Sequence, residues 1–320
     1  MEMTFINVGY GDAILVLNQG FTLLLDGGSS LPEEFEGFEH RIPAVEYLMA
    51  QGIKQIDLLV ISHIHEDHVC GLEAILEQIP VKEIRLPFDP AFFEQTKEMQ
   101  PDETAPRSAH LFSKALNVIG RLMQKAKEET IPVNPLQCGD ELELPGDLKL
   151  SVLAPARKNC ERFEYLLSEV YSMDDPTEAL VEMDRTSNAT SLLIDLACDG
   201  VHCLLAADSV PANWSEVEFS LLENENVLKL PHHGQVDSFS EYFMKNMPLK
   251  YVITTASSDR RYNSANKAVY ESLQNLHPEL NFLFTDEREY LPYFSQPQGF
   301  QAIKLHFSSG KITPEFMTVS

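Results

Sequence analysis

One short stretch constrains this chain more than any other: Ser62-His63-Ile64-His65-Glu66-Asp67-His68, with four potential metal ligands within six residues. Residues 56–61, just before it, are apolar and rich in branched side chains, which predicts a buried strand. Residues 69–76, just after it, predict the start of a helix. Because α/β folds bind ligands at such strand-to-helix turns, the stretch predicts a metal site on an α/β domain.

The spacing of the four ligands predicts two neighbouring metal positions. Residues i and i+2 of an extended loop point to the same side, so His63 and His65 can bind one ion. Asp67 and His68 come next along the loop and are expected to turn toward a second metal position. Imidazole nitrogen with carboxylate oxygen suits Zn²⁺, Mn²⁺ or Fe better than Mg²⁺ or Ca²⁺. Cys70 adjoins the group as an alternative ligand, although a core position in the first helical turn is favoured.

Length, composition and net charge indicate which kinds of protein are compatible with this site. The chain has 320 residues, of which 44% are hydrophobic, so it is long and apolar enough for a large core. The net charge of -25 argues against broad, non-specific binding of nucleic acid. A nucleic-acid substrate stays open, because bound divalent ions invert the local field.

The N-terminus and the cysteines predict a cytoplasmic protein. The first residues lack a basic n-region and an apolar h-region, so no signal peptide is expected. No apolar run reaches the length of a membrane span, which predicts no membrane association. The five cysteines have no paired spacing and are expected to be reduced thiols.

Strand-like and helix-like segments alternate along both halves of the chain. Strands are predicted at residues 3–8, 13–17, 21–25, 81–86, 140–144, 148–153, 191–196, 202–206 and 226–231, and helices at 43–51, 110–129 and 160–185. The first three strands predict an antiparallel meander, because glycine turns join them. The pattern predicts one α/β domain over residues 1–320, with two sheets inside and helices outside.

Two segments of this domain are predicted to be helical insertions, at about residues 88–130 and 158–186. The first carries Phe88, Phe92 and Phe93, which either line a substrate pocket or, as is favoured, pack in the core. The second is acidic and broken at residues 174–176, as a lid or a solvated helical excursion would be.

Further candidate ligands also follow predicted strands. Asp208 ends one strand, where its carboxylate could bridge two ions or cap a turn. His232 and His233 end another and precede a glycine, which is a stronger signal. Asp12 and Asp26 follow early strands, either as partners of metal-bound histidines or as turn caps.

Seven segments follow one another in the order found in a known family. They are Phe5-Ile6-Asn7-Val8-Gly9-Tyr10-Gly11-Asp12-Ala13-Ile14, Asp26-Gly27-Gly28, the His-x-His-x-Asp-His stretch, Leu153-Ala154-Pro155, Asn188-Ala189-Thr190-Ser191-Leu192, Ala207-Asp208 and Lys229-Leu230-Pro231-His232-His233-Gly234. On these segments, roughly over residues 3–305, the chain resembles the metallo-β-lactamase-fold hydrolases. More narrowly, it is similar to the metallo-β-lactamase domain of the ComEC DNA-uptake family, with Tyr10 where a glutamine is usual.

The resemblance implies a single-domain αββα four-layer sandwich with two divalent transition-metal ions, Zn or Mn favoured, at one edge of the sheets. One ion is expected on His63 and His65. The other is expected on Asp67, His68 and one histidine of the pair 232–233. Asp208 is expected to bridge the two ions, and with Asp67 to belong to the catalytic centre.

Two departures from the family's pattern bear on the site. Many members add a histidine before the bridging aspartate, whereas Asn188 occupies that region here, so the His63/His65 position is expected to hold its ion more weakly. Ser264 and the alanine after it stand where relatives carry His-Pro, which bears on catalytic competence and on the substrate. Arg260 and Arg261 could supply phosphate contacts instead, or serve as surface residues.

The chain is therefore predicted to be a metallo-hydrolase, with phosphodiesterase or nuclease activity as the leading expectation. Substrate contacts are expected from Asn188, Lys229, Arg260, Arg261 and Ser264. Two alternatives stay open. One is hydrolysis of a small phosphoester, a cyclic nucleotide or a lactone. The other is a metal-binding regulatory or interaction module with a protein partner in a larger assembly.

Overall fold

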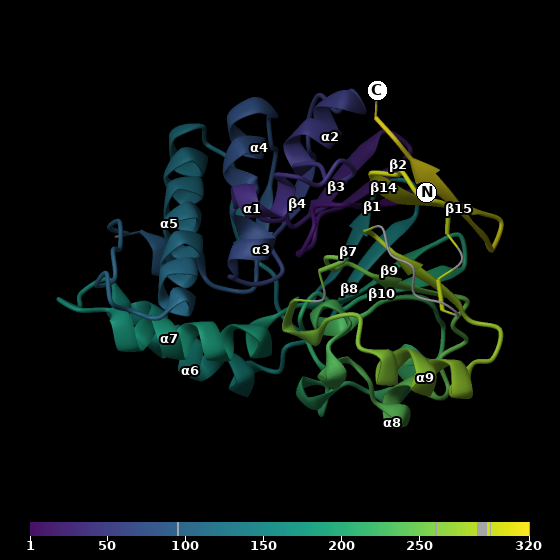
Figure 1. Ribbon diagram of the computed structural model, residues 1–320. Coiled ribbons are helices and arrows are strands. Elements are labelled where there is room, and N and C mark those ends of the chain that lie inside the picture. Colours follow the sequence, from purple (N-terminus) through teal and green to yellow (C-terminus); the bar gives the residue numbers. More distant parts are fainter. Residues whose placement is uncertain (95, 260, 287–292, 295, 320) are drawn as a thin grey trace.

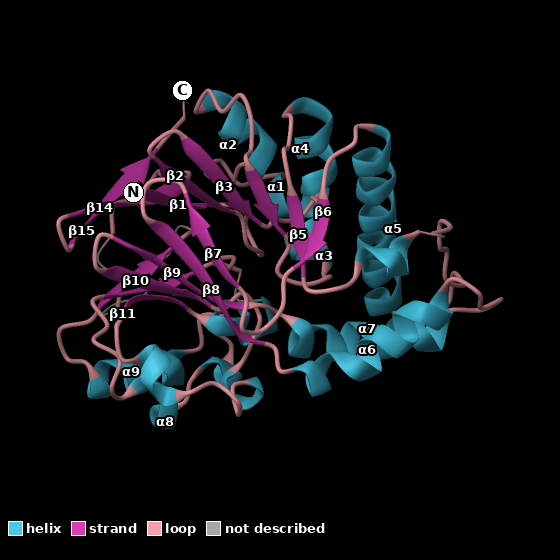
Figure 2. Cartoon of the chain, turned by 180° about the vertical axis from the view of Figure 1, so that it is seen from behind, coloured by secondary structure: helices cyan, strands magenta, loops and turns pink. Residues whose placement is uncertain are grey.

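Two β-sheets pack face to face, and helices cover their outer faces (Figures 1 and 2). The computed structural model describes residues 1–94, 96–259, 261–286, 293–294 and 296–319. The predicted four-layer α/β sandwich is therefore confirmed.

The first sheet has eight strands in the order β15-β14-β1-β2-β3-β4-β5-β6. They are β1 (Glu2–Ile6), β2 (Ile14–Asn18), β3 (Phe21–Leu25), β4 (Leu58–Val60), β5 (Ile84–Leu86), β6 (Val133–Pro135), β14 (Ala302–Ser308) and β15 (Lys311–Met317). Strands β1 to β3 form the predicted antiparallel meander, and β3 to β6 are parallel. Because β14 pairs with β1, both chain ends lie on the same side of the molecule (Figure 1).

The second sheet has seven strands in the order β13-β12-β11-β10-β9-β8-β7. They are β7 (Glu141–Leu144), β8 (Leu148–Ala154), β9 (Leu193–Cys198), β10 (Val201–Leu205), β11 (Glu225–Lys229), β12 (Tyr251–Thr254) and β13 (Asn281–Phe284). The predicted hairpin of β7 and β8 is present, with β9 and β10 continuing the antiparallel part. Strands β10 to β13 are parallel, so their carboxyl ends share one edge.

The helices pack through apolar stripes. They are α1 (Pro32–Phe35), α2 (Ala44–Ala50), α3 (Glu66–Val69), α4 (Leu72–Gln78), α5 (Arg107–Glu128), α6 (Arg157–Val170), α7 (Thr177–Ser187), α8 (Glu241–Met244) and α9 (Lys267–Leu276). Phe163 of α6 and Met183 of α7 are buried in the same core as Phe112 of α5. Phe88 stacks on Phe163 at 4.9 Å between ring centroids, so Phe88 packs in the core, as favoured.

The burial of β4 explains its continuous apolar run. Leu58 and Val60 belong to the core between the two sheets, whereas Leu59 belongs to the core beneath the helices. A strand covered on both faces needs apolar side chains on both, which removes the usual alternation.

The edges of the sheets determine where the histidine loop lies. The loop follows β4 in the first sheet, and the backbone amide of Leu192, just before β9, donates to the carbonyl of Ser62 in that loop. Strands β10 and β11 are parallel neighbours, with Leu205 opposite Lys229, so the residues beyond their ends lie side by side. The loop after β4 therefore meets Asp208 and the histidine pair at one edge of the sandwich.

Candidate metal centre

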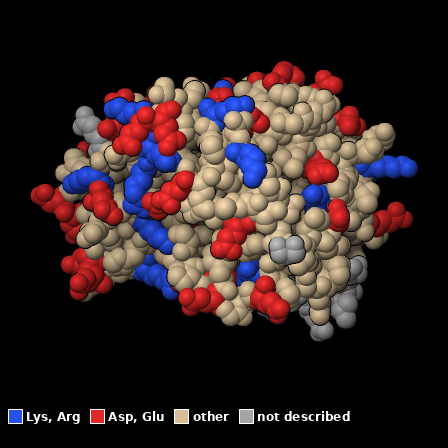
Figure 3. All heavy atoms as spheres, turned by 90° about the horizontal axis from the view of Figure 1, so that it is seen from above, with Lys and Arg blue, Asp and Glu red and all other residues tan. Residues whose placement is uncertain are grey.

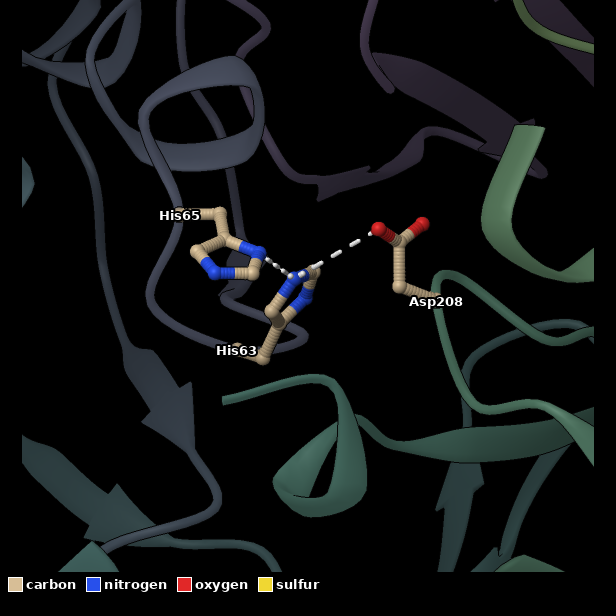
Figure 4. A group of neighbouring side chains, drawn as sticks. All are labelled: His63, His65 and Asp208. Atoms are coloured by element: carbon tan, nitrogen blue, oxygen red, sulfur yellow. Dashed lines mark hydrogen bonds and ion pairs between the residues drawn. The ribbon is translucent and has the colours of Figure 1, made fainter. Parts of the chain in front are cut away.

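The loop after β4 turns two histidines toward each other. His65 has extended backbone angles (φ -138°, ψ 157°) and α3 begins at the next residue. His63 Nε2 lies 3.0 Å from His65 Nδ1, and both rings point to the Asp208 side (Figure 4). The structure thus brings together the i, i+2 pair that the spacing predicts.

Asp208 lies between two groups of potential ligands. His63, His65 and Asp208 each offer an atom within 4.8 Å of the others, and Asp67, His68 and His233 do the same. The Asp208 Oδ2 atom is 3.9 Å from His63 Nε2. Its Oδ1 atom is 3.4 Å from His68 Nε2 and 3.2 Å from His233 Nε2. One carboxylate therefore faces both groups, as a bridging ligand would.

Several of these ligand atoms lack any hydrogen bond. His68 Nε2, His233 Nε2 and Asp208 Oδ1 are buried without a hydrogen-bond partner among the residues that the structure describes. A buried polar atom without a partner costs about 1–3 kcal/mol. Because three such atoms converge, and because imidazole and carboxylate suit transition metals, the residues present fit a metal ion.

The opposite side of each histidine ring has a fixed partner. Asp26 Oδ2 lies 2.8 Å from His68 Nδ1, and the carbonyl oxygen of Thr255 lies 2.6 Å from His233 Nδ1. Ser62 Oγ lies 3.0 Å from His63 Nδ1. Each Nε2 therefore faces the cluster, which is the arrangement that orients metal-binding histidines. Asp26 is predicted either to contact a metal-binding histidine or to cap a turn. Its contact with His68 gives it the position expected for the first role.

Lys229 occupies a different place from the one predicted. Its side chain is fully buried, and its ammonium group pairs with Asp12 and donates to the carbonyl oxygen of Ala207 at 2.8 Å. A buried ammonium needs such partners, because transfer away from water is costly. The prediction of a substrate contact is therefore wrong for Lys229, which lies behind the cluster and supports the Asp12 carboxylate.

Burial and the close charges shift the pKa values within the cluster in opposite directions. Burial opposes the charged form of Asp208, yet His233 and His68 hold its pKa well below the usual range. Burial likewise opposes protonation of His233, but Asp208 and Asp67 raise its pKa to about 9. For His63, burial and then the neighbouring His68 lower the pKa well below the usual range. The ionised Asp208 carboxylate and the protonated His233 ring therefore balance each other's charge, whereas the His63 ring is neutral.

The histidine pair after β11 separates into two environments. Both residues have left-handed backbone angles, with φ 46° at His232 and φ 52° at His233. This conformation costs an L-residue roughly 1–2 kcal/mol, and here it turns adjacent rings to different sides. His233 enters the ligand group, whereas His232 Nδ1 lies 3.1 Å from Asp237. Only His233 of the pair has the position of a ligand.

Asn188 and a residue of the preceding helix face the cluster. Asn188 Nδ2 lies 3.2 Å from His232 Nε2, and Asn188 Oδ1 is buried without a hydrogen-bond partner in the described part of the chain. The carbonyl oxygen of Asp184 lies 3.1 Å from His65 Nε2. The sequence alone does not single out Asp184, although its position four residues before Asn188 on one helical face is a usable signal.

A cleft of about 430 Å³ opens over the cluster. It is lined by Tyr10, His65, Glu66, Asp67, Arg107, Ser108, Leu111, Phe112, Asp184, Arg185, Asn188, Asp208, His232, Gln235 and Tyr262. Arg107 begins α5 and lies 2.7 Å from Glu33, and Arg185 lies in the last turn of α7, 3.4 Å from Glu182, so two helices bring exposed guanidinium groups to it. Neither arginine, nor Tyr262, follows from a local sequence pattern.

The remaining predicted substrate contacts differ from their expected positions. Ser264 is fully buried, and its hydroxyl lies 3.3 Å from the Tyr10 hydroxyl, so it supports a residue of the cleft without lining it. Arg261 is paired with Glu34 and Asp259. Arg260 lies outside the described residues. The alternative ligand Cys70 is buried in the core, where burial raises the pKa of its thiol.

Comparisons with known proteins agree with this architecture. Residues 6–154 match the model of the metallo-beta-lactamase superfamily. ComE operon protein 3 of Bacillus subtilis is 26% identical over 304 residues, which cover 91% of this chain and 33% of that protein. Ribonuclease J of Thermus thermophilus is 43% identical over 65 residues, covering 20% of this chain and 11% of the enzyme. The chain thus spans about a third of the first relative and a ninth of the second.

A solved structure supports the fold alone. A variant of the CmlA β-hydroxylase superposes with a TM-score of 0.52 at 11% identity, covering 96% of this chain and 54% of that one. Among the described residues, no helix has the length and apolar character needed to cross a membrane. The sandwich, the ligand cluster at its edge and the match of residues 6–154 together show a metallo-β-lactamase-like domain, and the chain is similar over 91% of its length to a part of ComE operon protein 3.

Proposed function

We propose that this chain is a phosphodiesterase that uses two divalent transition-metal ions, Zn²⁺ or Mn²⁺, with nucleic acid as the leading substrate class. One observation carries the proposal: the Asp208 carboxylate faces two ligand groups at the base of a cleft that two arginines line. The name of the relative Ribonuclease J, which describes hydrolysis of RNA, supports a phosphodiester substrate.

The ligand groups assign residues to each ion. His63, His65 and Asp208 would hold one ion, and Asp67, His68, His233 and Asp208 the other. When bound, such ions supply Lewis-acid activation of water and of the phosphoryl group. The first group offers three ligands and the second offers four, so the first is the position where weaker occupancy is expected.

The cleft offers groups that suit a phosphodiester. A guanidinium binds phosphate oxygens through two parallel hydrogen bonds, which Arg107 and Arg185 can provide from opposite helices. Tyr262 is exposed and packs edge-on against the buried Tyr10, with 5.5 Å between ring centroids, and an exposed aromatic face of this kind can stack with a base. These side chains bind and orient the substrate against the ligand cluster.

His232 is the residue best placed to move a proton. The Asp237 carboxylate lies 3.1 Å from its Nδ1 atom, while Nε2 faces the cleft beside Gln235 at 2.9 Å. A carboxylate on one ring nitrogen fixes the tautomer and the orientation of the ring. His232 Nε2 would then take a proton from the attacking water and pass it to the leaving oxygen, a role that Ser264 cannot fill where relatives carry His-Pro.

Surface charge and cleft size limit the form of the substrate. Acidic and basic side chains are interspersed on the face shown in Figure 3, which favours recognition inside the cleft over non-specific binding to a broad surface. The cleft has the volume of a small-ligand site. A single-stranded end is therefore favoured over a duplex, and a small phosphodiester or cyclic nucleotide is the second candidate.

A substrate panel tests the proposal. The purified chain with Mn²⁺ or Zn²⁺ is incubated with single-stranded DNA, single-stranded RNA, bis-p-nitrophenyl phosphate, cyclic nucleotides and a lactone. We expect hydrolysis of at least one phosphodiester, loss of that activity in Asp208→Asn, and retention in the exposed turn variant Asp199→Asn. Metal-loaded protein that cleaves no phosphodiester would overturn the proposal, and cleavage of the lactone alone would point to the other hydrolase class. Inactivity towards every substrate would favour the regulatory or interaction role.

A further inference from the structure

A second group of potential ligands lies at the far ends of the strands that carry Asp208 and His233. His202 is the second residue of β10, and Glu225 is the first residue of β11. Asp195 lies on the neighbouring strand β9. Because Asp208 and His233 follow the opposite ends of β10 and β11, this group is separate from the metal centre described above.

The three side chains converge. His202 Nδ1 lies 2.9 Å from Asp195 Oδ2 and 3.1 Å from Asp195 Oδ1. His202 is also opposite Glu225 in the pairing of β10 with β11, at a point where the register shifts. One ligand atom from each of the three lies within 4.8 Å of the others.

The Glu225 carboxylate provides the main evidence for a bound ligand in this group. The residue is fully buried, and both carboxylate oxygens lack a hydrogen-bond partner among the residues that the structure describes. An isolated buried carboxylate is strongly unfavourable unless a cation or a proton neutralises it. Lys149, the basic residue that acts on Asp195 and His202, forms its own ion pair with Glu141 at 2.8 Å. Among the described residues, no lysine or arginine therefore forms an ion pair with the Glu225 carboxylate.

We propose that Asp195, His202 and Glu225 bind a further divalent transition-metal ion, which ties β9, β10 and β11 together. One imidazole and two carboxylates form a donor set that suits Zn²⁺, and a divalent charge neutralises both acids. His202 and Asp195 are partly exposed, at 29% and 13% of their side-chain surfaces, so an ion has a path to the site.

The role of this ion is structural. Its ligands come from three adjacent strands, and the pairing of β10 with β11 also sets the positions of Asp208 and His233. Binding to the folded state alone stabilises that state by mass action. The inference does not depend on the phosphodiesterase activity, because neither the ligands nor the measurement below involve catalysis.

Metal stoichiometry tests the site. The full chain is stripped with a chelator, dialysed against a low concentration of free Zn²⁺, and analysed by native mass spectrometry. We expect Glu225→Gln and His202→Gln each to hold one ion fewer than the wild type, and Glu143→Gln, an exposed acid on the same sheet, to hold the wild-type number. His202 is partly exposed, so His202→Gln is expected to fold. It therefore provides the test on its own if Glu225→Gln does not fold.

Two further results distinguish this site from the metal centre. The double variant His233→Ala/Glu225→Gln is expected to lose one more ion than His233→Ala alone. Zn²⁺ is expected to raise the Tm of the wild type by several degrees more than that of folded Glu225→Gln or His202→Gln. Equal ion counts in the wild type and in a folded Glu225 or His202 variant would overturn the proposal. Glu225 would then be a protonated, neutral buried acid, which glutamine closely resembles in shape.

Discussion

The Oδ1 atom of Asp208 lies 3.2 Å from the Nε2 atom of His233. Both atoms are buried, and neither has a hydrogen-bond partner within the part of the chain that the structure describes. Their closeness follows from the parallel pairing of β10 with β11, which places the residues after the two strands next to each other. This relationship distinguishes His233 from its neighbour His232 and leads directly to a test.

The two histidines are expected to differ in what their loss removes. His233→Ala should release one metal ion, because it deletes a ligand atom. His232→Ala should keep the full metal content and lose about 10²–10⁴-fold in kcat, the usual contribution of a general acid or base. Metal analysis and steady-state kinetics on both variants check this. Loss of an ion from His232→Ala, with none lost from His233→Ala, would reverse the assignment.

Asp26 is expected to act through the histidine that it contacts. Its Oδ2 atom lies 2.8 Å from His68 Nδ1, and its Oδ1 atom accepts from the Ser62 amide at 2.8 Å. Asp26→Asn should weaken metal affinity or activity by about 10–100-fold. The asparagine side chain has a single oxygen, so it cannot accept hydrogen bonds from both His68 and the Ser62 amide. Competition with a chromogenic chelator measures the affinity. An unchanged affinity in a folded variant would assign Asp26 to the turn alone.

The cleft arginines are expected to bind substrate without taking part in proton transfer. Arg107→Ala and Arg185→Ala should each raise KM for a phosphodiester by about tenfold or more, with little change in kcat, since a charge-assisted hydrogen bond contributes about 1.5–3 kcal/mol. Arg162→Ala, an exposed arginine of α6, is the matched control. Unchanged KM in both cleft variants would exclude them from phosphate binding.

Lys229 is expected to matter for stability. Lys229→Met leaves the buried Asp12 carboxylate without its cation, and breaking a buried pair in this way costs about 3–5 kcal/mol. Lys82→Met removes the exposed partner of Asp57, where a loss of about 0–1 kcal/mol is expected. Urea unfolding of both variants provides the comparison. A Lys229→Met protein as stable as the wild type would contradict the supporting role of this side chain.

Local signals in the sequence are sufficient for much of the fold. The meander of β1 to β3 and the hairpin of β7 and β8 follow from short apolar runs that glycine-containing turns join. The histidine loop is also local, because its four ligands lie within six residues after a strand. Asp208 and the histidine pair follow from the same rule of strand ends, which is why the positions of the cluster could be predicted before any contact was known.

Other parts of the site depend on contacts that no local pattern contains. Lys229 lies on a strand whose side chains are buried on both faces, so its sequence position does not reveal a partner in Asp12. Arg107 and Arg185 share the cleft only because α5 packs against α7. The different environments of His232 and His233 result from their left-handed backbone angles, which depend on the surrounding fold.

The order in which the ligands occur along the chain has a consequence for biosynthesis. Residues 63–68 are made before Asp208 and His233, which follow only after strands β7 to β10 have been synthesised. A nascent chain that stops before residue 208 has two incomplete half-sites and no bridging carboxylate. Metal loading should therefore follow completion of both sheets, and a growing chain in the cell should hold no hydrolytic centre until its second half has docked on its first.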